Sequence, residues 1–221
     1  MSRPVVVLRP EPGNRATVQR LGAAGLKAIA LPLFAVRPVD WALPDIDGYD
    51  AMLLTSANAL RFGGARLAAL RALPVLAVGA ATAAAARQAG FDVEAIGEGG
   101  VAALLDTSEA RRFTRLLHLG GRDRMIEPGG TVTTAITVYA SEALAVGADE
   151  LRRMENAVVM LHSGRAASRL DALADIDRGT VRLAAISDTV AVAAGEGWGR
   201  CAAAAAPTDE ALVALAARLA D

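Results

Sequence analysis

The sequence has little of several residue types that mark common functional classes. It contains one cysteine and two histidines among 221 residues. A single cysteine excludes a disulfide within the chain and a thiolate metal cluster, and it fits a reducing cytoplasm, where we expect the protein to act. Aromatic residues make up only 4% of the chain. We therefore expect helices that pack closely around small side chains, mostly alanine.

The sequence also lacks an excess of either charge and lacks a long hydrophobic run. It has 23 basic and 24 acidic residues, and this balance argues against a protein that binds nucleic acid through bulk positive charge. The mean hydropathy of +0.35 argues against disorder. The uncharged stretch 72–86 falls short of the roughly 18 residues of a membrane span, and the run Val5–Leu8 is too short for a signal peptide.

Short β-rich runs alternate with helical patterns along the chain. The β-rich runs are Val5–Leu8, Met52–Leu54, Val75–Val78, Val93–Ile96, Leu116–Leu119, Val132–Val138, Ala157–Leu161, Val181–Ile186 and Cys201–Ala204. The helical patterns are Arg15–Ala24, Asn58–Leu70, Ala80–Ala89, Asp149–Met154, Arg165–Leu173, Thr189–Gly195 and Asp209–Leu219. This alternation predicts an α/β fold with parallel sheets that carry helices on both faces.

Several residue pairs recur at an offset of 107 positions. They are Ser56 and Ser163, Thr82 and Thr189, Gly90 and Gly197, and Phe91 and Trp198. We interpret the pairs as two similar α/β units, although so few identities leave chance as the alternative. In this interpretation residues 1–35 and 141–221 form one discontinuous domain, and residues 39–137 are inserted in it. The linkers at about 33–38 and 138–143 are both extended, and side by side they would form a hinge over a cleft.

Motifs for several reaction classes are missing. His118 and His162 lack metal-ligand spacing, so we expect no metal and place both at strand ends in a structural or cleft-edge role. The sequence has no G-x-S-x-G elbow, no P-loop and no strand–GxGxxG–helix pattern. Lys27 looks like a surface residue, which gives Schiff-base chemistry little support.

What remains is a set of small hydroxyl and glycine residues at strand-to-helix turns. They are Ser56, Gly79, Thr82, Gly120, Gly121, Ser163, Ser187, Thr189 and Thr208. In parallel α/β sheets such turns lie at the carboxyl ends of the strands, where ligands bind, and helix N-termini there attract anions. The alternative for each hydroxyl residue is plain helix capping, with a prior of roughly two in three.

Three further positions lie beside these turns. Arg9-Pro10 follows the first strand, and Arg122 follows Gly120-Gly121. Either arginine can pair with a carboxylate or simply be a solvated turn residue. Tyr139 lies at the second crossing, where its phenol would donate a proton or order a water, or else only pack at a hinge.

Five segments together resemble the uroporphyrinogen-III synthase family. They are Val-Val-Val-Leu-Arg-Pro (5–10) with Leu-Gly-Ala-Ala-Gly (21–25) and Leu-Pro-Leu (31–33), Leu-Leu-Thr-Ser-Ala-Asn-Ala (53–59), Val-Gly-Ala-Ala-Thr-Ala (78–83) with Ala-Gly-Phe (89–91), Ile-Thr-Val-Tyr (136–139), and Ala-Ala-Pro-Thr-Asp-Glu-Ala-Leu (205–212). No motif is specific alone, but their order and spacing cover nearly the whole chain.

The resemblance implies two flavodoxin-like α/β domains, one inserted in the other and joined by a two-stranded linker. It implies that the enzyme, a lyase without a cofactor, cyclises hydroxymethylbilane, a linear tetrapyrrole, to uroporphyrinogen III. The terminal pyrrole ring is inverted through a spiro intermediate. Tyr139 would be catalytic. The expected substrate-binding residues are Arg9, Pro10, Ser56, Asn58, Gly79, Thr82, Gly120, Arg122, Ser163, Ser187, Thr189 and Thr208.

The sequence departs from the family pattern at two turns. His162-Ser163-Gly164 stands where Thr-Ser-Pro is usual, and 186–190 reads Ile-Ser-Asp-Thr-Val instead of Ile-Gly-Pro-Thr-Thr. These departures motivate an alternative, a non-catalytic relative that binds a tetrapyrrole or another polyanion. A weaker alternative is a two-domain protein that binds a nucleotide or a sugar. As partners we expect the small-molecule substrate and a transient contact with the preceding pathway enzyme, with no nucleic acid or membrane.

Overall fold

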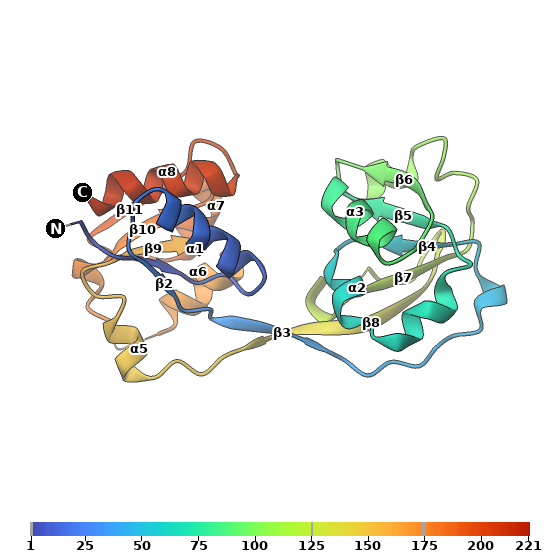
Figure 1. Ribbon diagram of the computed structural model, residues 1–221, viewed down its shortest axis with the longest axis horizontal. Helices are drawn as coiled ribbons and strands as arrows, with labels where there is room; N and C mark the ends of the chain where they lie inside the picture. The colour runs from blue at the N-terminus through green and yellow to red at the C-terminus, as the bar shows by residue number, and fades with distance from the viewer. Residues whose placement is uncertain (1, 125, 174–175) are drawn as a thin grey trace. The chain divides into compact units, whose positions relative to one another are not determined.

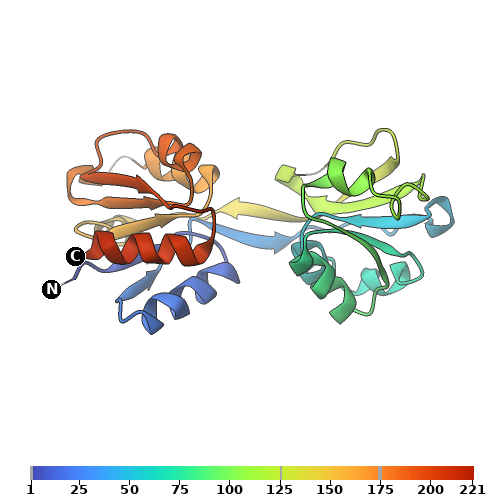
Figure 2. The same ribbon diagram turned by 90° about the horizontal axis from the view of Figure 1, so that it is seen from above.

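The computed structural model describes residues 2–124, 126–173 and 176–221 (Figure 1). The chain divides into two compact units. Met1–Ala35 and Glu142–Asp221 form the first, which we call the split unit. Val36–Ser141 form the second, which we call the inserted unit. Each unit is a sheet with helices on both faces (Figures 1 and 2), which confirms the α/β class predicted from the sequence.

The split unit is built on a five-stranded parallel sheet in the order β11-β10-β9-β1-β2. The strands are β1 Val5–Val7, β2 Ala28–Ala30, β9 Val158–Leu161, β10 Arg182–Ala185 and β11 Arg200–Ala203. Counted in chain order within the unit, the spatial order is 2-1-3-4-5, which is the flavodoxin-like arrangement. Strands β1 and β9 are buried along their whole length because helices cover both faces.

The helices of the split unit sort onto the two faces by their apolar residues. They are α1 Gly13–Ala23, α5 Ala148–Arg152, α6 Gly164–Asp171, α7 Asp188–Ala193 and α8 Asp209–Ala220, with a 3-10 turn at Arg178–Thr180. Helices α1 and α8 pack on one face, where Leu21 and Leu215 meet Val5. Helices α5, α6 and α7 pack on the other, where Leu170 meets Val6.

The inserted unit is built on a sheet in the order β3-β8-β7-β4-β5-β6. Its strands are β3 Phe34–Pro38, β4 Ala51–Leu54, β5 Val75–Val78, β6 Val93–Gly97, β7 Leu116–Gly121 and β8 Val132–Ala143. If the count starts at β7 and continues from β8 to β4, the order β8-β7-β4-β5-β6 again becomes 2-1-3-4-5. The inserted unit therefore has the same strand arrangement, entered by the chain at a different strand.

The helices of the inserted unit differ in length and number from those that the sequence predicts. They are α2 Asn58–Phe62, α3 Ala80–Gln88 and α4 Val101–Leu105, with 3-10 turns at Ile46–Gly48, Ala65–Leu70 and Arg122–Arg124. A single helix over 58–70 was wrong, because Gly63 and Gly64 end α2 and Gly64 has a φ of 72°. In the split unit the helix expected over 189–195 was also too long, since α7 ends at Ala193 and Gly195 follows with a φ of 72°.

Both crossings between the units are paired strands. β3 and β8 are neighbours in the sheet, and each contains one boundary between the units. The N–H of Val39 donates to the carbonyl of Val138 at 3.0 Å, and the N–H of Leu144 donates to the carbonyl of Leu33 at 2.9 Å. These two bonds give an antiparallel pairing.

The repeat is present in the structure, but its offset changes along the chain. Strands β4 and β9 have bounds that differ by 107 positions. After them the pairing register moves by one, because Met52 pairs with Val75 whereas Val159 pairs with Leu183. The helices that follow therefore begin 108 positions apart, since Gly79 is the N-cap of α3 and Ser187 is the N-cap of α7. Thr82 and Thr189 are therefore not equivalent, although the sequence paired them.

Candidate functional site

In the split unit, the polar turn residues gather at one edge of the sheet. Arg9 follows β1, His162 and Ser163 follow β9, Ser187 follows β10, and Thr208 precedes α8 after β11. These four strands are parallel neighbours, so their carboxyl ends lie along the same edge. The edge is where open α/β sheets bind ligands.

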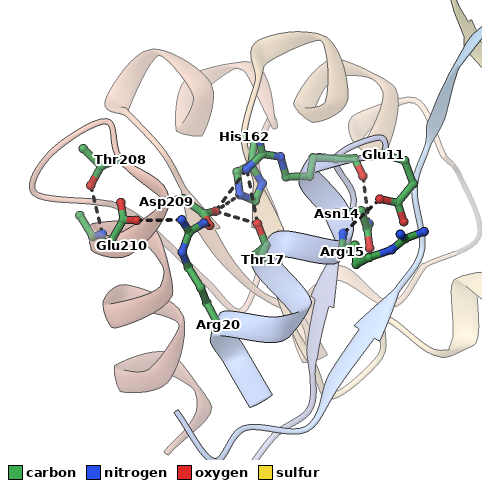
Figure 3. Close-up of polar contacts among 11 residues, drawn as sticks. Glu11, Asn14, Arg15, Thr17, Arg20, His162, Thr208, Asp209 and Glu210 are labelled. Carbon is green, nitrogen blue, oxygen red and sulfur yellow. Dashed lines mark hydrogen bonds and ion pairs between the residues drawn. The ribbon is translucent and has the colours of Figure 1, made fainter. Parts of the chain in front are cut away.

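Asp209, the first residue of α8, connects Arg9 and His162 of this edge with two residues of α1 (Figure 3). Its Oδ1 accepts hydrogen bonds from Thr17 Oγ1 at 2.8 Å and His162 Nε2 at 2.8 Å. Arg9 Nη1 lies 3.3 Å from the same oxygen. Oδ2 pairs with Arg20, whose other terminal nitrogen lies 3.1 Å from Glu210. Three segments far apart in the sequence, α1 with the loop before it, the turn after β9, and α8, are thereby joined.

The charges in this network follow from burial and hydrogen bonding. Burial alone would raise the pKa of Asp209, but hydrogen bonds from His162, Thr17 and Arg20 together lower it below its usual value. Burial lowers the pKa of His162, and the hydrogen bond to Asp209 opposes this only in part. The ionised Asp209 can only accept, so Nε2 of the neutral His162 carries the proton. Nδ1 is then a buried lone pair without a hydrogen-bond partner among the described residues.

Arg9 is fixed through its backbone as well as its side chain. Asn14, at the start of α1, is 1% exposed, and its Nδ2 donates to the carbonyls of Val7 at 2.8 Å and Arg9 at 2.9 Å. The carbonyl of Pro10 accepts from the N–H of Asn14 at 3.1 Å, so Pro10 contributes to the turn through its backbone. Glu11 accepts from the N–H of Arg15 at 3.3 Å (Figure 3).

Helix capping accounts for three of the predicted hydroxyl residues in this unit. Ser163, Ser187 and Thr208 are the N-caps of α6, α7 and α8. Their hydroxyl oxygens accept from the N–H groups three residues on, at 3.3, 3.4 and 3.2 Å respectively. Thr189 is different, because it is the second residue of α7 and is exposed.

The corresponding edge of the inserted unit begins its helices in another way. Ser56 Oγ accepts from the N–H of Asn58 at 3.2 Å, and Asn58 in turn accepts from Arg61 at 3.1 Å. Gly79 is the N-cap of α3 with φ 85° and ψ 148°, and no side chain caps that helix. Thr82 lies inside α3 and is 5% exposed, so it is a buried residue of the first turn.

Tyr139 lies in β8 next to the end of β7. It pairs with Gly121, and its ring fills the space that a Cβ on Gly121 would enter at 2.5 Å. The ring is largely buried at 8% exposure and its centroid lies 6.4 Å from that of Phe62. Arg122 begins the exposed 3-10 turn directly after β7. The phenol is therefore rigidly placed at the carboxyl end of this sheet.

His118 does not end a strand, as the sequence suggested, but lies within β7 and is fully buried. Its ring occupies the space beside Gly120, where a Cβ would come within 2.6 Å of it. Nε2 lies 3.2 Å from Thr55 Oγ1, and burial lowers the pKa of His118 to about 4. Gly120 thus makes room for the neutral imidazole of His118.

The comparisons with known proteins agree with this architecture. The family model of uroporphyrinogen-III synthase HemD matches residues 15–214. The chain belongs to the uroporphyrinogen-III synthase family. No curated protein matches the sequence. Among solved structures, the uroporphyrinogen-III synthetase of Helicobacter pylori is 18% identical, with a TM-score of 0.65 and coverage of 98% of this chain and 99% of that one. A mutant uroporphyrinogen III synthase from Thermus thermophilus is 16% identical, with a TM-score of 0.50 and coverage of 98% of each chain.

Membership in the uroporphyrinogen-III synthase family confirms the resemblance found in the sequence, but the sequence analysis missed part of the polar edge. It did not single out Asn14, Thr17, Arg20 or Asp209. Asp209 follows a Thr N-cap, so by pattern it is an ordinary acidic residue of a first helical turn. Its partners Thr17 and Arg20 are 192 and 189 positions away in the sequence. No local periodicity indicates pairs so far apart.

Proposed function

We propose that the protein is an active uroporphyrinogen-III synthase, a lyase that closes hydroxymethylbilane to uroporphyrinogen III. The match of the family model over residues 15–214 carries this proposal. Loss of the terminal hydroxyl as water gives an azafulvene, which the substituted carbon of the far pyrrole ring attacks. The resulting spiro intermediate fragments and recloses with that ring inverted.

The two polar edges support distinct parts of this reaction. Departure of the hydroxyl requires a proton, and the buried, rigidly packed phenol of Tyr139 is the candidate donor. The acetate and propionate arms of the substrate are carboxylates, which Arg9, Arg122 and the N–H groups at the start of α3 can bind. The remaining predicted binding residues, Pro10, Ser56, Asn58, Thr82, Gly120, Ser163, Ser187, Thr189 and Thr208, shape these turns. Closing a linear tetrapyrrole is mainly a problem of bringing its two ends together.

The test is incubation of the pure protein with enzymatically generated hydroxymethylbilane, followed by separation of the product isomers. We expect the type III isomer to exceed the type I isomer that forms by spontaneous closure. Type I alone, at the spontaneous rate, would contradict the proposed activity. Saturable binding of the product without isomer selectivity would instead support the non-catalytic alternative.

We also propose that the protein acts in the cytoplasm, without a cofactor, and contacts the preceding pathway enzyme transiently. In this view residues 1–35 with 141–221 and residues 39–137 act as two domains linked by β3 and β8. Among the described residues no helix is both long and apolar enough to cross a membrane. Cross-linking in the presence of the enzyme that supplies hydroxymethylbilane would test the contact.

A further inference from the structure

We infer that Asp209 is a positioning residue that presents one edge of the Arg9 guanidinium to a carboxylate arm of the substrate, and that Gly13 provides the space for this placement. The inference rests on the proposed function, since it assigns one arm of that substrate to the split unit. Neither Asp209 nor Gly13 belongs to the binding residues expected from the family resemblance.

The first argument is the way in which Asp209 engages Arg9. Both described hydrogen bonds of the Arg9 side chain use Nη1, which lies 3.3 Å from Asp209 and 3.4 Å from Thr17. Within the described part of the chain, Nε and Nη2 of Arg9 have no hydrogen-bond partner, and the side chain is 32% exposed. Nε and Nη2 form the edge of a guanidinium that fits a carboxylate with two parallel bonds.

The same edge of a guanidinium binds a carboxylate elsewhere in the chain, with both bonds on one carboxylate oxygen. In the inserted unit, Arg115 donates to Asp50 Oδ1 from Nε at 3.1 Å and from Nη2 at 2.7 Å. That pairing holds the pKa of Asp50 at about 2, with the Arg115 hydrogen bond as its largest cause. Arg9 keeps the corresponding edge available because Asp209 occupies the other end of its guanidinium.

The second argument is independent of charge. A Cβ on Gly13 would lie 2.4 Å from Arg9 Nε and 2.6 Å from Arg9 Nη2, so this position of the guanidinium requires glycine. Gly13 is the first residue of α1 and adopts ordinary helical geometry, so nothing in the backbone demands glycine there. The residue is explained by the space that it leaves for Arg9.

The third argument concerns the balance of charges around Asp209. Its facing groups are Arg9 from the loop after β1, Thr17 and Arg20 from α1, and His162 from the turn after β9. With His162 neutral, Asp209 is shared between two arginines, so its charge does not cancel that of Arg9 alone.

The deciding experiment compares Gly13→Ala with Gly22→Ala. Both glycines lie in α1, but a Cβ on Gly22 meets nothing within 4 Å. We expect Gly13→Ala to raise the KM for hydroxymethylbilane about tenfold with kcat within twofold of the parent, and Gly22→Ala to change neither. Thermal unfolding should show that Gly22→Ala is at least as stable as the parent, since alanine is the better helix former, and that Gly13→Ala remains folded. Equal KM values for the two variants would overturn the inference.

A second set of variants tests Asp209 directly. Asp209→Asn should raise KM as Arg9→Gln does, and Arg9→Gln combined with Asp209→Asn should be no worse than Arg9→Gln alone. Asp149→Asn is the control, because Asp149 forms an exposed ion pair with Arg152 at 2.6 Å in the same unit. Additive effects of Arg9→Gln and Asp209→Asn would contradict positioning. If Asp209→Asn does not fold, the glycine pair still decides.

Binding of uroporphyrin separates failure of this inference from failure of the proposed function. Uroporphyrin carries the acetate and propionate arms but does not react, so its quenched fluorescence gives a Kd without turnover. We expect Gly13→Ala to raise the Kd of uroporphyrin about tenfold and to leave the Kd of the esterified porphyrin unchanged. A parent protein that forms only the type I isomer but shows this difference would refute the synthase activity and keep the carboxylate site. Full synthase activity with equal Kd values for the parent and Gly13→Ala would keep the synthase activity and refute the carboxylate site at Arg9.

Discussion

The two units have the same strand order, but they begin their helices with different chemistry. In the split unit the N-caps of α6, α7 and α8 are Ser163, Ser187 and Thr208, and each hydroxyl accepts a backbone N–H. In the inserted unit the N-caps of α3 and α4 are Gly79 and Gly100, with φ of 85° and 94° and no side-chain cap. A hydroxyl thus accepts one N–H at the start of each of these three helices in the split unit, whereas no side chain caps α3 or α4 in the inserted unit.

The difference extends to the charged groups at the two edges. The split unit joins Asp209 to Arg9, Arg20 and His162, whereas the inserted unit has the aromatic ring of Tyr139 and the exposed Arg122 at the matching edge. The edge of the split unit therefore has arginines held by Asp209, and the edge of the inserted unit has Arg122, a phenol and helix starts without side-chain caps. Two sheets of the same strand order thus carry different polar groups at this edge, and a net charge of −1 is compatible with both.

The largest effect that separates the units should be the response of the inserted unit to acid. The pKa of His118 is about 4 in the folded state, against 6.5 in an exposed histidine. The unfolded chain therefore takes up a proton first as the pH falls below 6.5, and the folded state loses about 3 kcal/mol of stability by pH 4. Urea unfolding at several pH values, with hydrogen exchange to resolve the units, measures this loss.

His118→Gln is the control for this prediction. It removes the titrating group but keeps a side chain that can hydrogen-bond to Thr55, so the inserted unit should lose most of its dependence on pH between 6.5 and 4. The split unit should respond less, because the hydrogen bond to Asp209 opposes the effect of burial on the pKa of His162. Equal acid responses in the two units would contradict the comparison.

The next largest effect should be on catalysis at the edge of the inserted unit. Tyr139→Phe removes only the phenolic oxygen, so we expect kcat to fall about a hundredfold while the fold persists. Tyr49→Phe is the matched control in the same unit, since the Tyr49 hydroxyl donates to Thr134 Oγ1 at 2.9 Å near the amino-terminal ends of β4 and β8, opposite the carboxyl ends. Tyr49→Phe should cost about 1 kcal/mol of stability and leave turnover unchanged. Unchanged kcat in Tyr139→Phe would remove Tyr139 from proton transfer.

Local sequence patterns account for the fold better than for the polar edges. The run Val75–Val78 matches β5 without error because an uninterrupted apolar run between turn residues is typical of a buried strand. The helix expected over 58–70 failed because two adjacent glycines weigh against helix more than the apolar spacing weighs for it. The Asp209 network was missed because the folded sheet, and no spacing in the chain, brings β1, β9 and α8 together.

Substitution of the glycine N-cap of α3 should have a smaller effect, and it tests the contrast between glycine and hydroxyl N-caps. A Cβ on Gly79 would meet no atom within 4 Å. The loss of stability in Gly79→Ala therefore comes only from the backbone, whose φ of 85° and ψ of 148° alanine adopts poorly. We expect a loss of about 1–3 kcal/mol in the free energy of unfolding. Gly22→Ala, with ordinary helical geometry, should instead stabilise the protein. A Gly79→Ala protein as stable as the parent would show that this turn relaxes without cost.

The smallest effect should come from the caps of the split unit. Thr208→Ala removes the oxygen that accepts from the N–H of Ala211 at 3.2 Å, so we expect a loss of about 1 kcal/mol in the free energy of unfolding. Thr208→Gly should lower the free energy of unfolding by only about a few tenths of a kcal/mol, because glycine lets water reach the N–H groups. Thr208 is also one of the residues expected to bind the substrate, so a KM equal to that of the parent would leave it with capping alone. A raised KM with unchanged stability would instead make Thr208 a direct contact of the substrate, and the split unit would then bind carboxylates through a helix start as the inserted unit is proposed to do.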